Sequence, residues 1–141
     1  LNGIRDIIFL NGSALMVVVA TNTDSLIFFK RSTFSLFAYT FSFRQSVKYS
    51  YPHGLLRIND SFFYATSWAN NTVYSYTFVN DTFWREALVL DARSHASASG
   101  GNHLRIDECG RFWFALGPAG ILIFSPQGTF IGSFNSSSVD T

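Results

Sequence analysis

Hydrophobic and polar positions alternate along this chain in short runs, and Gly, Asn, Asp or Pro interrupts each run. The apolar positions are rich in β-branched and aromatic residues, which favour strands over helices when they alternate. We therefore expect an all-β chain. The expected strands cover residues 4–9, 15–20, 25–31, 34–41, 54–58, 62–67, 72–78, 83–90, 102–106, 111–116, 120–125 and 129–134.

The residues between the expected strands have the chemistry of tight turns. Segments such as "INDS", "VNDT", "DECG" and "SPQG" supply Asn, Asp and Gly, which tolerate positive φ, and Pro, which presets a turn. The segment 91–101 is small and polar, and we interpret it as a connector rather than a domain boundary. The pattern thus predicts one domain over residues 1–141.

A repeat of four strands runs through the chain. "GLLRINDSFFYATSWANNTVYSYTF" (residues 54–78) is similar to "NHLRIDECGRFWFALGPAGILIFSPQGTF" (residues 102–130), and the matching Arg57 and Arg105 are 48 residues apart. An earlier copy lies within residues 5–41. Four strands repeated every roughly 40–50 residues are typical of β-propeller blades. We expect blades at about 4–41, 54–90 and 102–134.

The second and third copies resemble the NHL-repeat family of β-propellers, which is related to YWTD-type and lactonase-type propellers. The resemblance rests on "YPHGLLRINDSFFYATSWANNTVYSYTF" and "NHLRIDECGRFWFALGPAGILIFSPQGTF", which follow the family's order of inner strand, acidic turn, aromatic strand and final Gly-containing strand. The family's Asp after the second strand is missing, because Thr66 and Leu116 occupy that position. The resemblance implies four-stranded antiparallel blades whose inner strands surround a channel.

Three blades are fewer than the roughly four to eight that close a propeller, and an open ring leaves strand edges unpaired. We expect the chain to be part of a larger propeller. Two alternatives stay open. The blades pair with another chain, for instance by self-association through their open edges, or the strands form a packed β sandwich.

Composition narrows the range of partners. The chain has 141 residues, of which 48% are hydrophobic and 13% charged, and this supports a buried core rather than disorder. Ten Lys and Arg against nine Asp and Glu give a net charge of +1. The basic residues are scattered, so we expect no nucleic-acid partner. The longest apolar run, residues 14–20, is too short to span a bilayer as a helix.

Five Asn-x-Ser/Thr triplets fall at the expected turns. They begin at Asn11, Asn59, Asn70, Asn80 and Asn135. Such triplets accept glycans in secreted proteins, so we expect a secreted or cell-surface glycoprotein. The alternative is that turns rich in Ser and Asn create the triplets by chance.

Two motifs suggest chemistry but are better explained as turns. Cys109 is the only cysteine and lies beside Asp107 and Glu108, whose carboxylates disfavour the thiolate that a nucleophile needs. We interpret Cys109 as a turn residue or as half of a disulfide to another segment. "GPAG" (residues 117–120) has no Lys and precedes a strand, whereas a phosphate loop opens a helix. It predicts a hairpin turn.

The histidines suggest a metal site. His53 and His103 lie at the starts of the inner strands of successive copies. Resemblance to NHL-like amidating lyases implies zinc held by histidines that line the channel. For either zinc or calcium, Asn102 and His103 are the expected metal ligands. Resemblance to lactonase-type propellers implies calcium instead, held by oxygen donors such as Asn59, Asp60, Asn102 and Asp107. The alternative is that these are ordinary polar residues and that no cofactor binds.

Arg57, Arg105 and Trp68 are the expected ligand-binding residues. Arg57 and Arg105 hold matching positions in the repeat, and a guanidinium binds a carboxylate ligand with two hydrogen bonds. The alternative is an ion pair with Asp60, Asp107 or Glu108. Trp68 falls at an expected hairpin tip, where it would anchor a protein or a sugar. Trp84 and Trp113 alternate with strand residues, and we expect them to pack between blades.

The sequence contains no convergent set of nucleophile, base and orienting group. We therefore expect a non-catalytic extracellular module that presents loops to a protein or glycan. The alternative is an enzyme, a calcium- or zinc-dependent propeller lactonase or lyase, with the rest of its site outside this segment.

Overall fold

The computed structural model describes residues 3–12, 14–33, 38–48, 50–80, 83–96 and 100–135. Within these residues the chain forms twelve strands and three single 3-10 turns. The strands are β1 (Ile4–Leu10), β2 (Leu15–Ala20), β3 (Ser25–Arg31), β4 (Tyr39–Ser46), β5 (Pro52–Asn59), β6 (Phe62–Ser67), β7 (Thr72–Asn80), β8 (Phe83–Asp91), β9 (Gly101–Ile106), β10 (Phe112–Leu116), β11 (Ile121–Phe124) and β12 (Phe130–Phe134).

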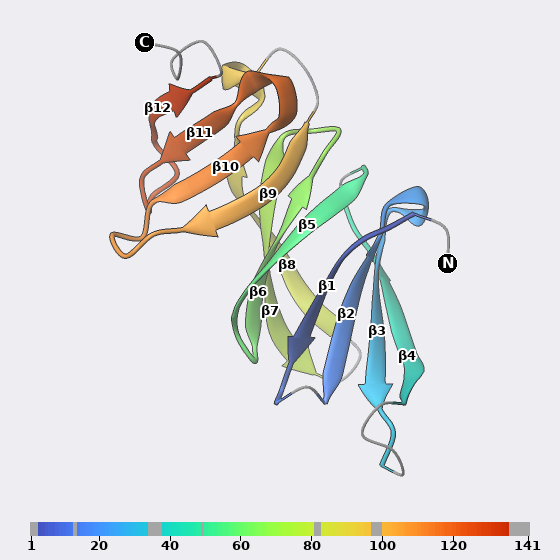
Figure 1. Cartoon of the computed structure of the whole chain (residues 1–141). Helices are drawn as coiled ribbons and strands as arrows, with labels where there is room; N and C mark the ends of the chain where they lie inside the picture. Colours follow the sequence, from blue (N-terminus) through green and yellow to red (C-terminus); the bar gives the residue numbers. More distant parts are fainter. Residues whose placement is uncertain are drawn as a thin grey trace.

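The strands form three antiparallel sheets of four, each built from consecutive strands (Figure 1). We call β1–β4 blade 1, β5–β8 blade 2 and β9–β12 blade 3. The inner strands β1, β5 and β9 lie side by side, whereas β4, β8 and β12 form the outer edges. This confirms the prediction of an all-β chain with four-stranded, propeller-like blades. Within the described residues no strand joins blade 3 to blade 1.

One strand of the first blade was predicted in the wrong place. We expected a strand at residues 34–41, but β4 covers Tyr39–Ser46, and residues 34–37 lie outside the described part. The reason is pairing. Phe43 lies opposite Phe28 and stacks on it with ring centroids 4.2 Å apart, which carries the strand past residue 41.

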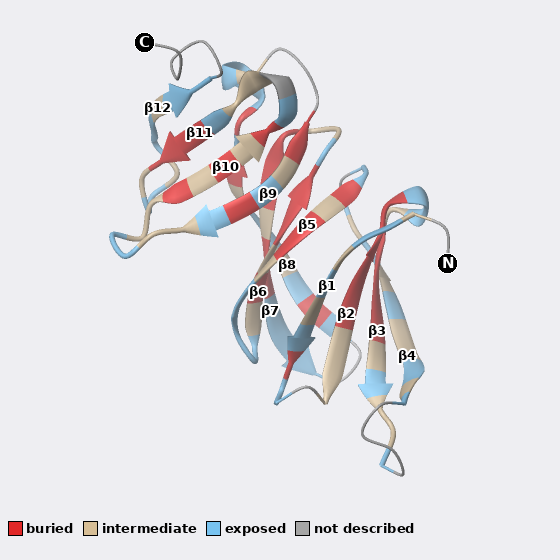
Figure 2. Ribbon diagram, in the orientation of Figure 1, coloured by how far each residue is buried: buried red, intermediate tan, exposed pale blue. Residues whose placement is uncertain are grey.

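The core consists of two apolar clusters, one between each pair of neighbouring blades. Figure 2 shows the buried residues concentrated on the middle strands of the blades, such as β2, β3, β6, β10 and β11. The first cluster contains Leu10, Val17, Val19, Leu26 and Phe28 of blade 1 and Leu55, Phe63, Ala65, Tyr76 and Trp84 of blade 2. The second contains Val73, Leu90 and Ala92 of blade 2 and, on the blade 3 side, Leu104, Phe112, Phe114, Leu116, Leu122 and Phe124. Burial of this apolar surface is what holds the blades together.

Hydrogen bonds between neighbouring blades also fix how the blades are aligned with each other. The Gln45 side chain of β4 holds the backbone of Trp84 in β8: its Nε2 donates to the Trp84 carbonyl at 2.8 Å and its Oε1 accepts from the Trp84 N–H at 3.0 Å. Thr66 donates from Oγ1 to the Asn102 carbonyl of blade 3 at 2.7 Å. Asp6 accepts from the Leu55 N–H at 2.7 Å. Buried polar groups are thus paired across both blade boundaries.

Candidate ligand-binding site at the start of the inner strands

A cleft lies at the end of the molecule where the inner strands begin. In an antiparallel meander, the start of each inner strand and the turn between its second and third strands share one edge. Here that edge bears a cleft of about 390 Å³ between blades 1 and 2. We call it the inner-strand cleft, and its lining residues are Arg5, Thr21, Asn22, Tyr51, His53 and Trp68.

Two aromatic side chains form one wall of the inner-strand cleft. Tyr51 and Trp68 meet edge to face, with ring centroids 6.2 Å apart, and they are 49% and 39% exposed. Tyr51 has a φ of 52°, a left-handed conformation that is uncommon outside glycine. Hydrogen bonds hold it there: its N–H donates to Asp24 at 2.8 Å, and its carbonyl accepts from the Trp68 N–H at 2.9 Å. The wall is therefore fixed in place while its rings face solvent.

His53 is a neutral histidine with an available nitrogen. Its Nδ1 is buried and has no hydrogen-bond partner within the described part of the chain. Burial, followed by the positive charge of Arg5 and the neighbouring His103, holds the pKa of His53 below its ordinary value of 6.5, and the Asp6 carboxylate and a hydrogen bond to the Asn102 backbone oppose this less strongly. At neutral pH the imidazole is therefore uncharged and can accept a hydrogen bond or bind a metal.

His103 of β9 lies next to His53 of β5, as the matching strand starts predicted. The two ring centroids are 6.1 Å apart at an interplanar angle of 84°. Asn102, the other expected metal ligand, uses its carbonyl to accept from Thr66. No cluster of three His, Cys, Asp or Glu side chains suited to a metal exists among the described residues.

The expected calcium ligands do not converge. Asn102 lies at the start of β9, whereas Asp107 follows the end of that strand. Asn59 and Asp60 lie at the corresponding far end of β5. Because Asn102 is separated from the others by the length of a strand, the four residues do not surround one ion. That part of the calcium prediction is wrong.

Arg57 and Arg105 are not equivalent, contrary to the expected match. Arg57 lies opposite Phe63, which packs toward blade 1. Arg105 lies opposite Trp113, while the residues on either side of Trp113 pack toward blade 2. The two arginines therefore emerge from opposite faces of their blades. A bulge near the end of β5 shifts its register, so Leu55, and not Leu56, corresponds to Leu104.

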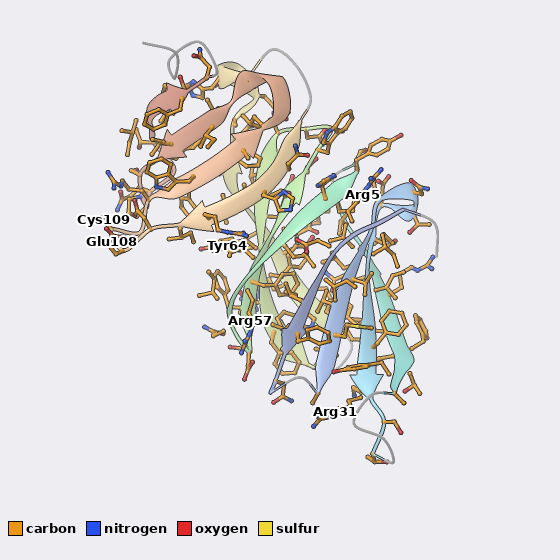
Figure 3. The ribbon with its side chains drawn as sticks, in the orientation of Figure 1. Arg5, Arg31, Arg57, Tyr64, Glu108 and Cys109 are labelled. Carbon is orange, nitrogen blue, oxygen red and sulfur yellow. The ribbon has the colours of Figure 1, made fainter. Side chains whose placement is uncertain are left out.

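The local partners of these arginines also differ. Arg57 donates to Asp60 at 2.7 Å, and this hydrogen bond is the main reason why the pKa of Asp60 is below its ordinary value. Arg105 donates to the Leu104 carbonyl at 2.9 Å. Figure 3 shows Arg57 and Arg31 at the end of the sheets opposite to Arg5. The arginine that lines the inner-strand cleft is Arg5 of β1. Ligand binding by Arg57 and Arg105 stays a prediction.

The acidic turn of blade 3 is structural, as predicted. Asp107 accepts from the Cys109 N–H at 3.0 Å, from Arg111 Nε at 2.7 Å and from Trp113 Nε1 at 2.9 Å. The bond from Trp113 contributes most, followed by the backbone N–H and the side chain of Arg111, and together they lower the pKa of Asp107 from 3.8 to about 2. Cys109 is an exposed free thiol on this turn.

Asp107→Asn is expected to lower the melting temperature in a pH-dependent way. A carboxylate with a depressed pKa stabilises the folded state above its unfolded pKa, and this contribution is lost as pH falls through the folded pKa. The difference in melting temperature between wild type and Asp107→Asn should be largest above about pH 4 and should shrink toward pH 2. Thermal unfolding followed by circular dichroism between pH 2 and 7 measures it. Glu108→Gln on the same turn is the control, and an equal pH dependence in both variants would contradict this assignment.

The glycine-rich segment is a hairpin turn, also as predicted. Residues Gly117–Ala119 form a single 3-10 turn between β10 and β11. The Leu116 N–H donates to the Gly120 carbonyl at 2.8 Å and closes the hairpin. The segment opens no helix, so it lacks the geometry of a phosphate loop.

The predicted glycosylation sites lie at or near the surface, whereas the two other tryptophans pack against neighbouring side chains. Asn11, Asn59, Asn80 and Asn135 are exposed, and Asn70 is half-buried in the turn between β6 and β7. Their glycosylation stays a prediction. Trp84 packs between blades as expected. Trp113 instead stacks on Phe134 within blade 3, with ring centroids 5.9 Å apart.

No family model matches the sequence, and no curated protein does either. The fold is similar to solved structures. One is a candidate 6-phosphogluconolactonase from Bacteroides uniformis (TM-score 0.68, 16% identity, 91% of this chain and 39% of the other). Another is a protein of unknown function from Desulfotomaculum acetoxidans (0.67, 14%, 92% and 42%). A third is a luciferin-regenerating enzyme (0.61, 12%, 94% and 46%).

At these identities the comparisons establish the fold alone. The chain spans less than half the length of each of the three structures. No helix in the described residues has the length and apolar character needed to cross a membrane.

Proposed function

We propose that this chain is a ligand-binding segment of a secreted propeller and that its inner-strand cleft binds an acidic sugar of a glycan. The observation that carries the proposal is the pairing of a fixed aromatic wall, Tyr51 and Trp68, with Arg5 and a neutral His53 in one cleft. Aromatic faces pack against the apolar C–H faces of sugar rings. A guanidinium pairs with a carboxylate through two hydrogen bonds.

This proposal needs binding groups but no chemical step. Arg5 would pair with the sugar carboxylate, and His53 Nδ1, buried without a partner, would accept a hydrogen bond from a hydroxyl. Asn22 supplies a further amide at the rim. A cleft of about 390 Å³ is within the usual size of small-molecule sites.

A metal-dependent hydrolase or lyase is the second candidate. Two observations favour it: the fold likeness to structures described as a lactonase and a luciferin-regenerating enzyme, and the approach of His53 to His103. These two imidazoles do not fit a complete zinc site, because the described residues supply no third ligand. We therefore derive no catalytic step from them.

Glucuronate and glucose separate the two candidates when titrated by calorimetry and by Trp68 fluorescence. If the sugar binds in the inner-strand cleft, wild type should bind glucuronate more tightly than glucose. Arg5→Gln should lower the affinity for glucuronate by about 10-fold or more and leave the affinity for glucose unchanged. Trp68→Ala should lower the affinity for both sugars. Arg44→Gln, an exposed cation on β4, is the matched control.

Equal affinity for the two sugars, or an unchanged affinity in Arg5→Gln, would contradict the acidic-sugar proposal. Metal analysis of the same samples addresses the second candidate. Stoichiometric zinc that is lost in His53→Ala and in His103→Ala would favour the metal-dependent reading over the binding module.

The outward faces of blades 1 and 3 support the proposal of a larger propeller. Blade 1 exposes Ile7, Phe9 and Phe41 on the face away from blade 2, and blade 3 exposes Ile121 and Phe134 on its own far face. In a propeller such faces pack against further blades. Flanking sequence or a second copy of the chain would supply them, and self-association stays a prediction.

A further inference from the structure

A second, larger cleft lies at the opposite end of the sheets, between blades 1 and 2. Its volume is about 490 Å³, which is typical of sites for small molecules. We call it the inter-blade cleft. The residues that matter for its chemistry are Leu15, Lys30, Arg31, Asp60, Phe78 and Trp84. It shares no lining residue with the inner-strand cleft.

Trp84 lines this cleft, and its indole is an unsatisfied hydrogen-bond donor. The side chain is 1% exposed, and its Nε1 has no acceptor among the described residues. The backbone N–H and carbonyl of Trp84 are both paired with Gln45, so the indole N–H is the polar group left over. A buried donor without an acceptor is costly, and buried polar groups in proteins are nearly always paired. An acceptor oxygen from a ligand in the cleft would remove that cost.

The charges around the cleft favour an anion. Lys30 and Arg31, at the end of β3, contribute two positive charges to its lining. Asp60 is the acidic group among the lining residues that the structure describes, and it already accepts hydrogen bonds. It accepts from Arg57 and from the Asn11 N–H, each at 2.7 Å. Figure 3 shows Arg31 and Arg57 at this same end of the molecule. Counted over the described residues alone, the lining together with Arg57 carries more positive than negative charge.

The cleft also offers an aromatic surface. Phe78 lines it, is 40% exposed and meets Trp84 edge to face with ring centroids 5.3 Å apart. Leu15 contributes a half-buried aliphatic side chain. A ligand with an aromatic ring would pack on Phe78 and cover apolar surface that is now in contact with solvent.

We infer that the inter-blade cleft binds a small organic anion that carries an aromatic ring, with an oxygen of the anion accepting the hydrogen bond of the Trp84 indole. Arg31 and Lys30 neutralise the negative charge, and Phe78 and Leu15 contact the ring. This site is independent of the sugar site proposed above, because the two clefts lie at opposite ends of the strands.

Titration with phenylacetate, followed by the indole N–H signals in ¹H–¹⁵N spectra of the full chain, tests the inference. Trp84→Phe identifies the Trp84 signal. We expect phenylacetate to move this signal downfield and to leave that of Trp68 in place. Phenylacetamide, which is uncharged and similar in shape, is expected to bind at least about fivefold more weakly.

Arg31→Ala is expected to lower the affinity for phenylacetate at least about fivefold and to change the affinity for phenylacetamide little. Arg44→Ala is the matched control on β4, and Arg5→Gln in the inner-strand cleft should leave phenylacetate binding unchanged. Far-UV circular dichroism checks that each variant is folded, and Lys30→Ala replaces Arg31→Ala if the latter is not. The inference is overturned by an unmoved Trp84 signal, by equal affinity for the two probes, or by unchanged affinity in the folded cation variants.

Discussion

Gly54→Ala is expected to lower the free energy of unfolding by about 3 kcal/mol. A Cβ at Gly54 would lie far inside van der Waals contact with the Asn102 carbonyl oxygen, and also 3.1 Å from Thr66 Oγ1. The Asn102 oxygen is backbone of β9, so relief requires that β9 move away from β5. Such movement would also break the hydrogen bond that Thr66 donates to the same oxygen. Both effects act at the boundary between blades 2 and 3.

Gly132→Ala in β12 is the matched control for Gly54→Ala. Gly132 is also a strand glycine, and nothing lies within 4 Å of a Cβ built there. We expect its unfolding free energy to stay within about 0.5 kcal/mol of wild type. Urea unfolding followed by fluorescence measures both variants. A loss of less than about 1 kcal/mol in Gly54→Ala, or equal losses in the two, would show that the inner strands do not approach as closely as described.

Trp84→Ala is expected to cost about 4 kcal/mol of unfolding free energy. The indole contacts the rings of Phe63, Phe78 and Phe28, at centroid distances of 5.1, 5.3 and 5.9 Å. Removing it would leave a large cavity in the cluster that joins blades 1 and 2. The contact between blades 1 and 2 would then depend on the remaining residues of the cluster and on the hydrogen bonds between Gln45 and the backbone of residue 84.

Trp68→Ala and Trp84→Phe are the two variants with which the stability loss of Trp84→Ala is compared. Trp68 lies on the exposed wall of the inner-strand cleft, so its loss should cost less than about 1 kcal/mol. Trp84→Phe keeps a ring in the cluster and should fall between the two alanine variants. Equal unfolding midpoints for Trp84→Ala and Trp68→Ala would mean that the first cluster does not hold the blades together.

Alternation was enough to predict most of the fold. Each blade places one residue in two against a neighbouring blade, and this period of two is visible in runs such as those of β6 and β10. It failed for β4, where the sequence alternates over a longer stretch than the strand uses and only pairing with β3 fixes the register. It also failed for Arg57 and Arg105, because a bulge in one strand changes the face on which later residues emerge.

The candidate site was predicted only in part. His53, His103 and Trp68 were singled out by their positions at strand starts and at a turn. Tyr51 was missed because it precedes a strand and carries no motif, although a meander brings strand starts and alternate turns to one edge. The inter-blade cleft left no linear signal, because β2, β3, β7 and β8 contribute to it from distant parts of the sequence.

The cluster shared by blades 1 and 2 has a consequence for biosynthesis. A chain is made from its N-terminus, so β1–β4 are complete before Phe63, Tyr76 and Trp84 have been added. Until β5–β8 have emerged, Leu26 and Phe28 lack the partner surface that blade 2 supplies, and the nascent chain presents an apolar sheet of the kind that chaperones bind. The smallest piece of this protein that can bury its own core during synthesis is therefore a pair of blades.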